Sequence, residues 1–422
     1  MSSSEQSFKI SIPDSALESL QKKLALATFP DELELDSDEE RRKYGAPLAH
    51  VQRLVERWKT RTPDIANGSG MATDKEGFDW RRAEAKLNED LSPMFTRDIE
   101  VEGFGTLNLH YVHRKSVKEV DGKGRKPVPL LFVHGWPGSV IEVRKILPLL
   151  TNPENEDDLP FHVVAPSLPG FGFSEAPKKK GFNLTQYAEI FNKLMLALGY
   201  NEYVTQGGDW GFYITRRMAQ LYGHTHIKAW HTNYPGPGAL EPTFTTQPLH
   251  YLQHLFTPYT ATEKAALERS KWFSTQGMGY NIEQSTQPQT LGYSLADSPV
   301  GLLAWIYEKL VNWTDGYKWD DDEVLEWMSI YWLSRAGPAA SLRIYYEVTQ
   351  ANQRQIPARE KPTIPMGWSR FPQELRSFPR TWTENVGNLV FDSEHPSGGH
   401  FAAHEEPEKL VGDLRRMFEK HW

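Results

Sequence analysis

Apolar residues between positions 99 and 235 follow two alternating patterns, and each pattern predicts a different kind of element. Nearly unbroken apolar runs at 128–133 and 161–166 are typical of strands that are buried on both faces. Between and after these runs, apolar residues at helical spacing predict amphipathic helices, one of which is capped by Asn183 and closed by Gly199. Strands that alternate with amphipathic helices in this way predict a parallel, doubly wound α/β sheet.

The pattern before this region is different. Residues 1–98 carry apolar residues mainly at helical spacing, as in 48–58, and predict helices joined by loops rather than strands. Near residue 99 the spacing changes to the alternation of a β-hairpin, with arms at 95–102 and 107–113 and a glycine-containing turn between them. The α/β core is therefore expected to begin close to residue 99.

A second change occurs after residue 235. Residues 236–360 lose the alternation of strands with helices and become helical and rich in tryptophan, which predicts a helical cap inserted after a core strand. Sheet-like runs return at 362–367 and 386–391. We predict four parts: an N-terminal helical and meander extension (1–98), the first part of the core (99–235), a helical cap (236–360) and the second part of the core (361–422).

One short stretch carries the first candidate chemistry. Residues 202–211 join a β-prone run to a helix-patterned run through Gly-Gly-Asp-Trp-Gly, with Asp209 at the centre. Small residues two before and two after a central polar residue are what a nucleophile elbow of an α/β-hydrolase requires. A carboxylate that attacks carbon forms an ester, so Asp209 predicts a different reaction from an elbow serine. Taken alone, the stretch also fits a surface turn, and the prediction depends on partners elsewhere.

A candidate general base follows in the order that this fold uses. His400 comes directly after two glycines, in a loop that follows the last predicted strand, where α/β-hydrolases carry their base. An isolated loop histidine is more often inert, but the chain has 14 histidines and only His400 has both the glycines and the position. Together with Asp209 upstream, His400 is therefore predicted to be the general base.

The third expected member is a carboxylate that holds the imidazole tautomer and stabilises its charged form. Glu374 follows the strand predicted at 362–366 and precedes the strand that leads to His400, so we predict Glu374 as this acid. Asp392 and Glu394 lie nearer to His400 in sequence, but they share its loop and are less able to reach behind the ring.

Composition excludes several other classes of function. The chain has 422 residues, 39% of them hydrophobic, and a net charge of −8, which argues against a nucleic-acid partner. Cysteine is absent, so thiolate metal sites and cysteine nucleophiles are excluded. The polar N-terminus and the lack of long apolar windows predict a protein without a signal peptide or membrane anchor, located in the cytoplasm.

Four segments together resemble the microsomal-type epoxide hydrolases, including the soluble fungal ones. The segments are 134–139 (His-Gly-Trp-Pro-Gly-Ser), 207–211, 370–374 (Arg-Phe-Pro-Gln-Glu) and 398–403 (Gly-Gly-His-Phe-Ala-Ala). The resemblance covers essentially the whole chain and includes an N-terminal domain peculiar to that group. It implies hydrolysis of a small apolar epoxide by water to a vicinal diol through a covalent aspartyl ester, without a cofactor or metal.

The resemblance also assigns the remaining site residues. Tyr280 and Tyr345 match the two cap tyrosines that bind the epoxide oxygen, and Tyr346 is the alternative to Tyr345. The backbone N–H groups of Trp136 and Trp210 match the oxyanion hole of the family, and the Trp136–Pro137 bond is a candidate for the cis isomer. A phenol can donate a hydrogen bond to an opening epoxide while it stays neutral at rest.

Two other functions remain open on the sequence. A haloalkane dehalogenase shares the Asp nucleophile, the His base and the capped fold, but it needs halide-binding N–H donors instead of phenols. A catalytically inactive ligand-binding module is the alternative from a different class. The chain departs from the membrane-bound family members in lacking an apolar anchor, and it carries Glu374 where some relatives have Asp. The substrate and the oligomeric state are not determined, and a homodimer is left open.

Overall fold

The computed structural model of the chain describes residues 4–59, 77–236, 241–245, 248–256, 258–354 and 360–422. Its strands are β1 (Gln6–Phe8), β2 (Met94–Val101), β3 (Gly105–Arg114), β4 (Val128–Val133), β5 (Phe161–Pro166), β6 (Tyr203–Gly207), β7 (Ile227–Thr232), β8 (Pro365–Arg370) and β9 (Asn388–Glu394). Within the described residues they form one sheet in the order β1-β2-β3-β5-β4-β6-β7-β8-β9. The first three strands are antiparallel, and the pairs from β5 to β9 are parallel. The predicted α/β-hydrolase core with a mostly parallel sheet is confirmed.

The register of the central strands brings four loops together. Val133 at the end of β4 lies beside Gly207 at the end of β6, and Thr232 at the end of β7 lies beside Trp368 in β8. All five residues of β6 are buried, which agrees with a strand covered on both faces. Parallel strands end at the same edge of a sheet, so the loops after β4, β6, β7 and β8 leave the core close to one another.

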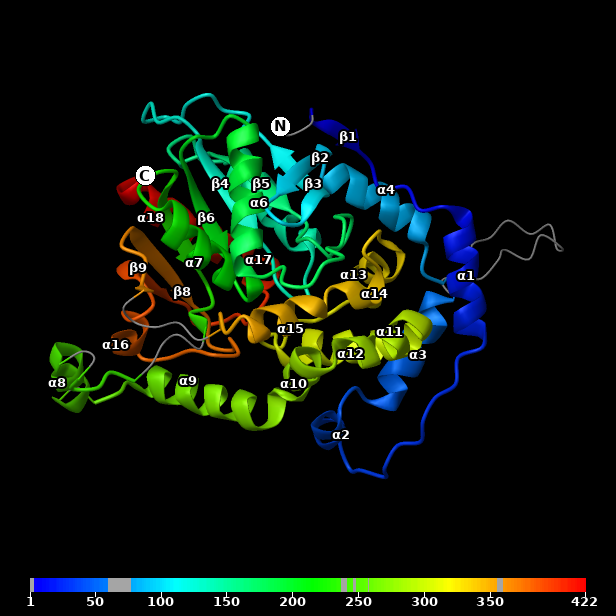
Figure 1. The fold of residues 1–422 in the computed structure, drawn as a ribbon. Coiled ribbons are helices and arrows are strands. Elements are labelled where there is room, and N and C mark those ends of the chain that lie inside the picture. Colours follow the sequence, from blue (N-terminus) through cyan, green and yellow to red (C-terminus); the bar gives the residue numbers. More distant parts are fainter. Residues whose placement is uncertain (1–3, 60–76, 237–240, 246–247, 257, 355–359) are drawn as a thin grey trace.

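Helices cover both faces of the sheet (Figure 1). On one face α6 packs against α7, which also contacts β4, β6 and β7, and on the other α18 packs against α5 and contacts β7 and β8. The core helices are η2, a 3₁₀ turn (Val140–Val143), α5 (Ile146–Thr151), α6 (Leu184–Ala197), α7 (Trp210–Tyr222), α16 (Arg380–Thr383), α17 (Ala402–Glu405) and α18 (Pro407–His421). The asparagine predicted to cap a helix does so, because the Asn183 side chain accepts a hydrogen bond from the Thr185 N–H.

The N-terminal segment differs in one respect from the helical pattern predicted for it. Its helices are α1 (Asp14–Ala25), α2 (Asp38–Tyr44), α3 (Leu48–Trp58) and α4 (Trp80–Asp90), but it also contributes β1, which pairs with β2 at the edge of the main sheet. A strand of three residues is too short to show the period-two alternation by which strands are recognised. Moreover, β2 begins at Met94, so the boundary predicted at residue 98 falls inside that strand.

The residues between β7 and β8 are helical wherever the structure describes regular elements there. These elements are α8 (Pro248–Phe256), α9 (Ala261–Trp272), η4, a π-helical turn (Phe273–Gly277), α10 (Gly279–Thr286), α11 (Pro288–Asp297), α12 (Pro299–Asn312), α13 (Asp321–Leu333), α14 (Gly337–Ala340) and α15 (Arg343–Gln350). Trp313 and Trp327 are almost fully buried in this region. We call α8 to α15 the cap.

The N-terminal helices pack on the cap rather than on the sheet alone. Contacts join α1 and α3 to α12, and α3 and α4 to α13. Arg57 forms a bidentate ion pair with Asp322 of α13, at 2.8 Å for each of the two hydrogen bonds. The N-terminal segment thereby holds the cap over the core from the side seen at the right of Figure 1.

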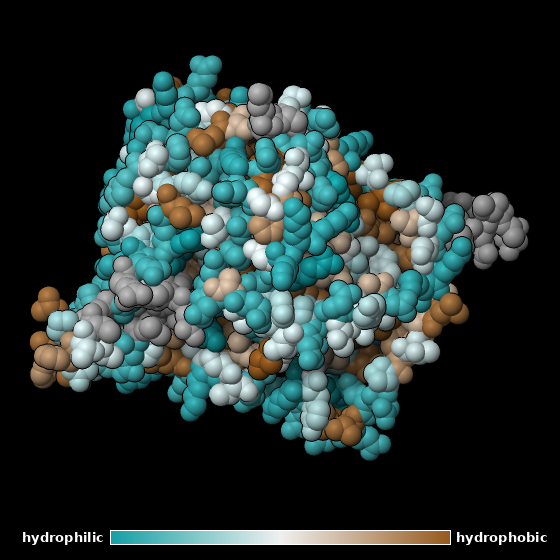
Figure 2. Space-filling model, in the orientation of Figure 1, coloured by the Kyte–Doolittle hydropathy of each residue, from teal (hydrophilic) through white to brown (hydrophobic). Residues whose placement is uncertain are grey.

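The surface is mostly hydrophilic in the view of Figure 2. Apolar side chains gather on α8 at the lower left, where Leu249 and Phe256 are about four-fifths exposed. None of the helices in the described part of the chain combines the length and the apolar character needed to cross a lipid bilayer.

Candidate active site

Asp209 lies at a sharp turn between β6 and α7. Its backbone has φ 49° and ψ −122°, an unfavourable conformation for a residue with a side chain, and such strain is typical of a nucleophile elbow. The turn is possible because its neighbours are glycines. A Cβ at Gly207 would lie 2.5 Å from the Gly211 carbonyl carbon, and a Cβ at Gly211 would lie 1.9 Å from the Val133 carbonyl oxygen.

His400 lies in the loop after β9, and backbone contacts from several elements fix this loop. The His400 N–H donates to the carbonyl of Trp313 in the cap at 2.8 Å, and Asn233 Nδ2 donates to the His400 carbonyl at 3.4 Å. Two glycines precede His400 because side chains would clash there: a Cβ at Gly398 would lie 2.6 Å from the Phe371 ring, and one at Gly399 would lie 2.5 Å from the Trp313 carbonyl oxygen. Gly398 also has φ 115°.

The structure brings Asp209, His400 and Glu374 into one line. His400 Nε2 lies 3.6 Å from Asp209 Oδ2, and His400 Nδ1 lies 2.5 Å from Glu374 Oε1. The same Glu374 oxygen accepts from the Leu375 N–H at 2.6 Å, which fixes the carboxylate behind the ring. Glu374 is 1% exposed and His400 is 6% exposed, so bulk water does not screen the pair.

The two alternative acids point elsewhere. Asp392 Oδ1 accepts from Arg370 Nε at 2.8 Å, and Glu394 Oε2 lies 2.9 Å from Arg370 Nη1. Both carboxylates are therefore engaged by the same arginine on β8. Only Glu374, of the three candidates weighed from the sequence, contacts His400.

The charges around His400 decide its protonation. Burial alone would favour the neutral ring, but the negative charge and hydrogen bond of Glu374, together with the nearby carboxylate of Asp209, outweigh burial and raise the pKa of His400 to about 10. The resting site therefore holds a protonated imidazolium between two carboxylates at neutral pH.

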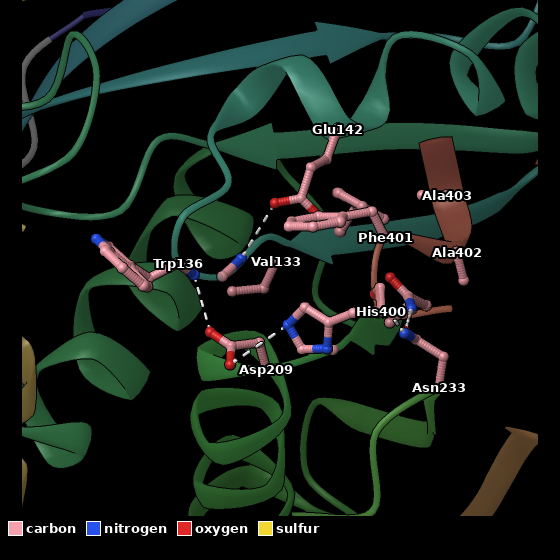
Figure 3. Close-up of a pocket in the computed structure, with 13 residues that line it drawn as sticks. Val133, Trp136, Glu142, Asp209, Asn233, His400, Phe401, Ala402 and Ala403 are labelled. Carbon is pink, nitrogen blue, oxygen red and sulfur yellow. Dashed lines mark hydrogen bonds and ion pairs between the residues drawn. The ribbon is translucent and has the colours of Figure 1, made fainter. Parts of the chain in front are cut away.

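The loop after β4 supplies a backbone donor to Asp209. The Trp136 N–H donates to Asp209 Oδ1 at 2.8 Å (Figure 3), and the Trp136–Pro137 bond is cis. A Cβ at Gly135 would lie 2.5 Å from Asp209 Cβ, so only glycine allows this approach. Trp210 begins α7, and its N–H is one of the first-turn donors that have no acceptor within the helix. Trp136 thus already donates to Asp209 in the structure, whereas the oxyanion-hole role of the two amides stays a prediction.

Tyr280 of α10 and Tyr345 of α15 lie together above this loop. Their rings are 5.9 Å apart, and both pack on Trp136, with Tyr280 stacked at 5.1 Å and Tyr345 edge-on at 5.7 Å. Tyr345 is 1% exposed, and no atom in the described part of the chain meets hydrogen-bond geometry with its hydroxyl. Tyr346 is 36% exposed instead. Burial raises the pKa of both phenols, and the charge of Asp209 raises them further, so both are neutral donors.

Three residues close to this constellation were not predicted from the sequence. Glu142 of η2 and Asn233 after β7 line a small cavity beside Asp209 and His400. The Trp313 ring packs edge-on against the His400 ring at 5.0 Å. Of the three, only Glu142 could have been noticed in the sequence, because it is the single acidic residue in the otherwise apolar run 140–143.

A second group of Ser, His and Asp side chains lies in the core but is sealed. Ser369 Oγ lies 3.0 Å from His231 Nε2 and donates to Asp413, which His395 also contacts at 2.7 Å. Ser369, His231 and Asp413 are fully buried, so this group ties β7, β8 and α18 together and offers no access to a substrate. Across the described residues no cluster of three or more His, Asp or Glu side chains has an arrangement that could hold a metal ion.

The fold and the site define an α/β-hydrolase that carries an aspartate at its nucleophile elbow. Residues 5–143 match the family described as Epoxide hydrolase N terminus, and residues 128–272 match the alpha/beta hydrolase fold family. The chain belongs to the epoxide hydrolase family.

Relatives support this membership along the whole chain. A protein of Stigmatella aurantiaca is 38% identical over 422 residues, which cover 97% of this chain and 84% of that protein. Epoxide hydrolase 1 of Sus scrofa is 35% identical, with 97% and 87% of the two chains covered. The solved structure of Aspergillus niger epoxide hydrolase is 34% identical and superposes with a TM-score of 0.80, covering 100% of this chain and 97% of that one.

Proposed function

We propose that this protein hydrolyses epoxides to vicinal diols through a covalent ester on Asp209. The observation that carries the proposal is the position of the Asp209 carboxylate. Its Oδ1 is held by the Trp136 N–H, its Oδ2 faces His400, and two neutral buried phenols lie above the same tryptophan. Phenols in this place favour an epoxide over the halide of a haloalkane dehalogenase, because an opening epoxide needs a donor at its oxygen.

In the first half-reaction Asp209 attacks an epoxide carbon. Oδ1 is engaged by a backbone donor, so Oδ2 is the oxygen free to form the new bond. The carbon–oxygen bond of the epoxide breaks as the Asp209–carbon bond forms, and the departing oxygen gains negative charge. Tyr280 and Tyr345 donate hydrogen bonds or a proton to that oxygen, which stabilises the transition state more than the ground state.

In the second half-reaction water cleaves the ester. Esterification removes the charge of Asp209, which is one of the causes that raise the pKa of His400, so the ring gives up its proton more readily at this stage. That proton neutralises the alkoxide or the phenolate that ring opening leaves, so both phenols and the new hydroxyl group are neutral before water attacks. The neutral His400 takes a proton from water as it attacks Asp209 Cγ, while Glu374 stabilises the imidazolium. The N–H groups of Trp136 and Trp210 stabilise the oxyanion on Oδ1, and Oδ2 leaves with the diol.

Heavy-oxygen labelling tests this scheme. In a single turnover in H₂¹⁸O with enzyme in excess over a styrene-type epoxide, the diol should be largely unlabelled, because its new oxygen comes from Asp209 Oδ2. Mass spectrometry of the peptide that contains Asp209 should show one ¹⁸O in the carboxylate. Multiple turnovers should then deliver label to the diol.

A direct attack by water, with Asp209 as a general base, predicts a labelled diol from the first turnover. That result would contradict the nucleophilic role of Asp209 without affecting family membership. A chain that merely binds ligands would give no diol from any epoxide, so the same assay also tests the inactive-module alternative.

The two tyrosines are predicted to act in ester formation. Tyr280→Phe and Tyr345→Phe should each slow alkylation of Asp209 by about 10²- to 10³-fold or somewhat less, since the partner phenol retains part of the stabilisation. The double variant should be far slower, while binding of the substrate changes little. Rapid-quench measurement of the ester, by intact mass, gives the rate.

Tyr346→Phe is the matched control because Tyr346 neighbours Tyr345 on α15 and is 36% exposed. It should alkylate at the wild-type rate. A fully active Tyr345→Phe combined with an inactive Tyr346→Phe would contradict the assignment of the second phenol.

The remaining features of the proposed function stay predictions. They are a small apolar epoxide as substrate, a cytoplasmic location, a possible homodimer, and a division of the chain into parts at 1–98, 99–235, 236–360 and 361–422. A screen of styrene-type, aliphatic and fatty-acid epoxides would identify the substrate class, and sedimentation would give the oligomeric state.

A further inference from the structure

A small cavity adjoins the ester-forming carboxylate on the core side. It offers about 20 Å³ to the centre of a water molecule and is lined by Asp209, His400, Glu142 and Asn233 among others. One water molecule needs roughly 10–15 Å³ by this measure, so the cavity holds one. A water there lies beside both the group it must attack and the base that must deprotonate it.

Glu142 is tied to the same loop as Asp209. The Gly135 N–H donates to Glu142 Oε1 over a long 3.5 Å hydrogen bond, and the next N–H, from Trp136, holds Asp209 Oδ1 at 2.8 Å. Figure 3 shows the Glu142 carboxyl group pointing toward this loop, with Asp209 and His400 beyond it. The successive N–H groups of Gly135 and Trp136 thus hold the carboxyl groups of Glu142 and Asp209 against the same loop, the one that follows β4.

The fold leaves room for this carboxyl group. A Cβ at Gly138 would lie 1.5 Å from Glu142 Oε1, so the glycine is needed for the observed position of the side chain. Burial, with a smaller contribution from the charge of Asp209, outweighs the opposing effects of His400 and the Gly135 N–H and raises the pKa of Glu142 to about 8. The group is therefore mostly a neutral acid at pH 7, whose carbonyl oxygen accepts hydrogen bonds.

We propose that Glu142 is a positioning residue that orients the water for hydrolysis of the Asp209 ester. The inference rests on the proposed function. One O–H of the water donates to His400 Nε2 and the other donates to Glu142, which turns the oxygen lone pair toward Asp209 Cγ.

The proton balance of the step leaves Glu142 unchanged. As the bond from water to Cγ forms, His400 Nε2 takes one proton and the oxyanion develops on Oδ1. When the Cγ–Oδ2 bond breaks, the diol oxygen takes that proton back from His400. Glu142 keeps its hydrogen bond throughout and neither gains nor loses a proton, so its contribution is geometric.

The test measures formation and decay of the ester separately, by rapid quench and intact mass with a styrene-type epoxide. Glu142→Leu removes the acceptor at similar size, and it should slow ester decay by about 10- to 100-fold with an unchanged rate of ester formation. Glu142→Gln keeps an acceptor oxygen and should restore most of the decay rate. Because both rates are counted per alkylated molecule, an unfolded fraction does not affect them.

Three outcomes would overturn the proposal. Wild-type decay in Glu142→Leu would show that the water needs no such partner. An equal loss in formation and decay would show a structural role. Decay as slow in Glu142→Gln as in Glu142→Leu would show that the acidic group itself exchanges a proton. Absence of any ester on the wild-type enzyme would instead contradict the proposed function.

A second variant tests the geometry while the carboxyl group stays in place. Gly138→Ala should displace the Glu142 carboxyl group and slow ester decay, but it should have little further effect when combined with Glu142→Leu. Additive effects of the two changes would mean that Gly138 acts on the site independently of Glu142, and they would count against the proposal.

Discussion

Asp209→Ala should reduce epoxide turnover by about 10⁴-fold or more, since it removes the elbow carboxylate that faces His400 and the Trp136 N–H. The methyl group fits the site, and removal of the carboxylate eliminates the first half-reaction entirely. Steady-state diol formation, followed by chromatography, measures the loss. Intact mass should show no adduct at any time.

Asp297→Ala provides the control for this prediction. Asp297 is an exposed aspartate at the end of α11 that pairs with Lys23 at 2.6 Å, away from the site. Its removal should leave turnover unchanged. If Asp209→Ala kept a tenth of the wild-type rate, the ester mechanism would be untenable.

His400→Gln should stop the reaction at the covalent ester on Asp209. Asp209 still attacks the epoxide, but no base remains to activate water, so ester decay should slow by at least about 10³-fold. The ester should then accumulate, with a mass increase equal to that of the epoxide. Glu374→Gln should slow the same step by about 10⁴-fold or less, since its role is to hold and stabilise the imidazolium.

His226→Gln is the matched control, because His226 bonds the Asn201 carbonyl in an exposed loop. It should neither accumulate an ester nor lose turnover. A His400→Gln enzyme that turns over normally, or one that fails to alkylate while properly folded, would remove His400 from the second half-reaction.

The sequence predicted the core of the site because its constraints are local. The elbow needs glycines on both sides of Asp209, and the His400 loop needs two glycines before it, so the close approaches that the structure shows leave a trace in the residue types. The choice of Tyr345 over Tyr346 could not be made in this way. It depends on which ring turns inward, and the structure gives 1% and 36% exposure for the two residues.

The parts that escaped prediction depend on contacts between distant segments. Trp313 belongs to the cap, and its ring contacts the ring of His400. Asn233 follows β7, and its side chain donates a hydrogen bond to the His400 carbonyl. Nothing in the neighbouring residues marks either one. β1 was missed for a different reason, since three residues at the sheet edge do not establish a period.

The small cavity beside Asp209 and the two phenols are built from different parts of the chain. The residues that line the cavity come from the core strands and from the loops and short helices that follow them, whereas Tyr280 and Tyr345 come from α10 and α15 of the cap. The residues proposed to cleave the ester thus belong to one part of the chain, and those proposed to stabilise the epoxide oxygen belong to another. In a chimera that exchanges the cap with a relative, the choice of epoxide can change while the apparatus that regenerates Asp209 is inherited intact. Trp313 is the exception, because it carries the cap's contact to His400 and would have to be retained in such an exchange.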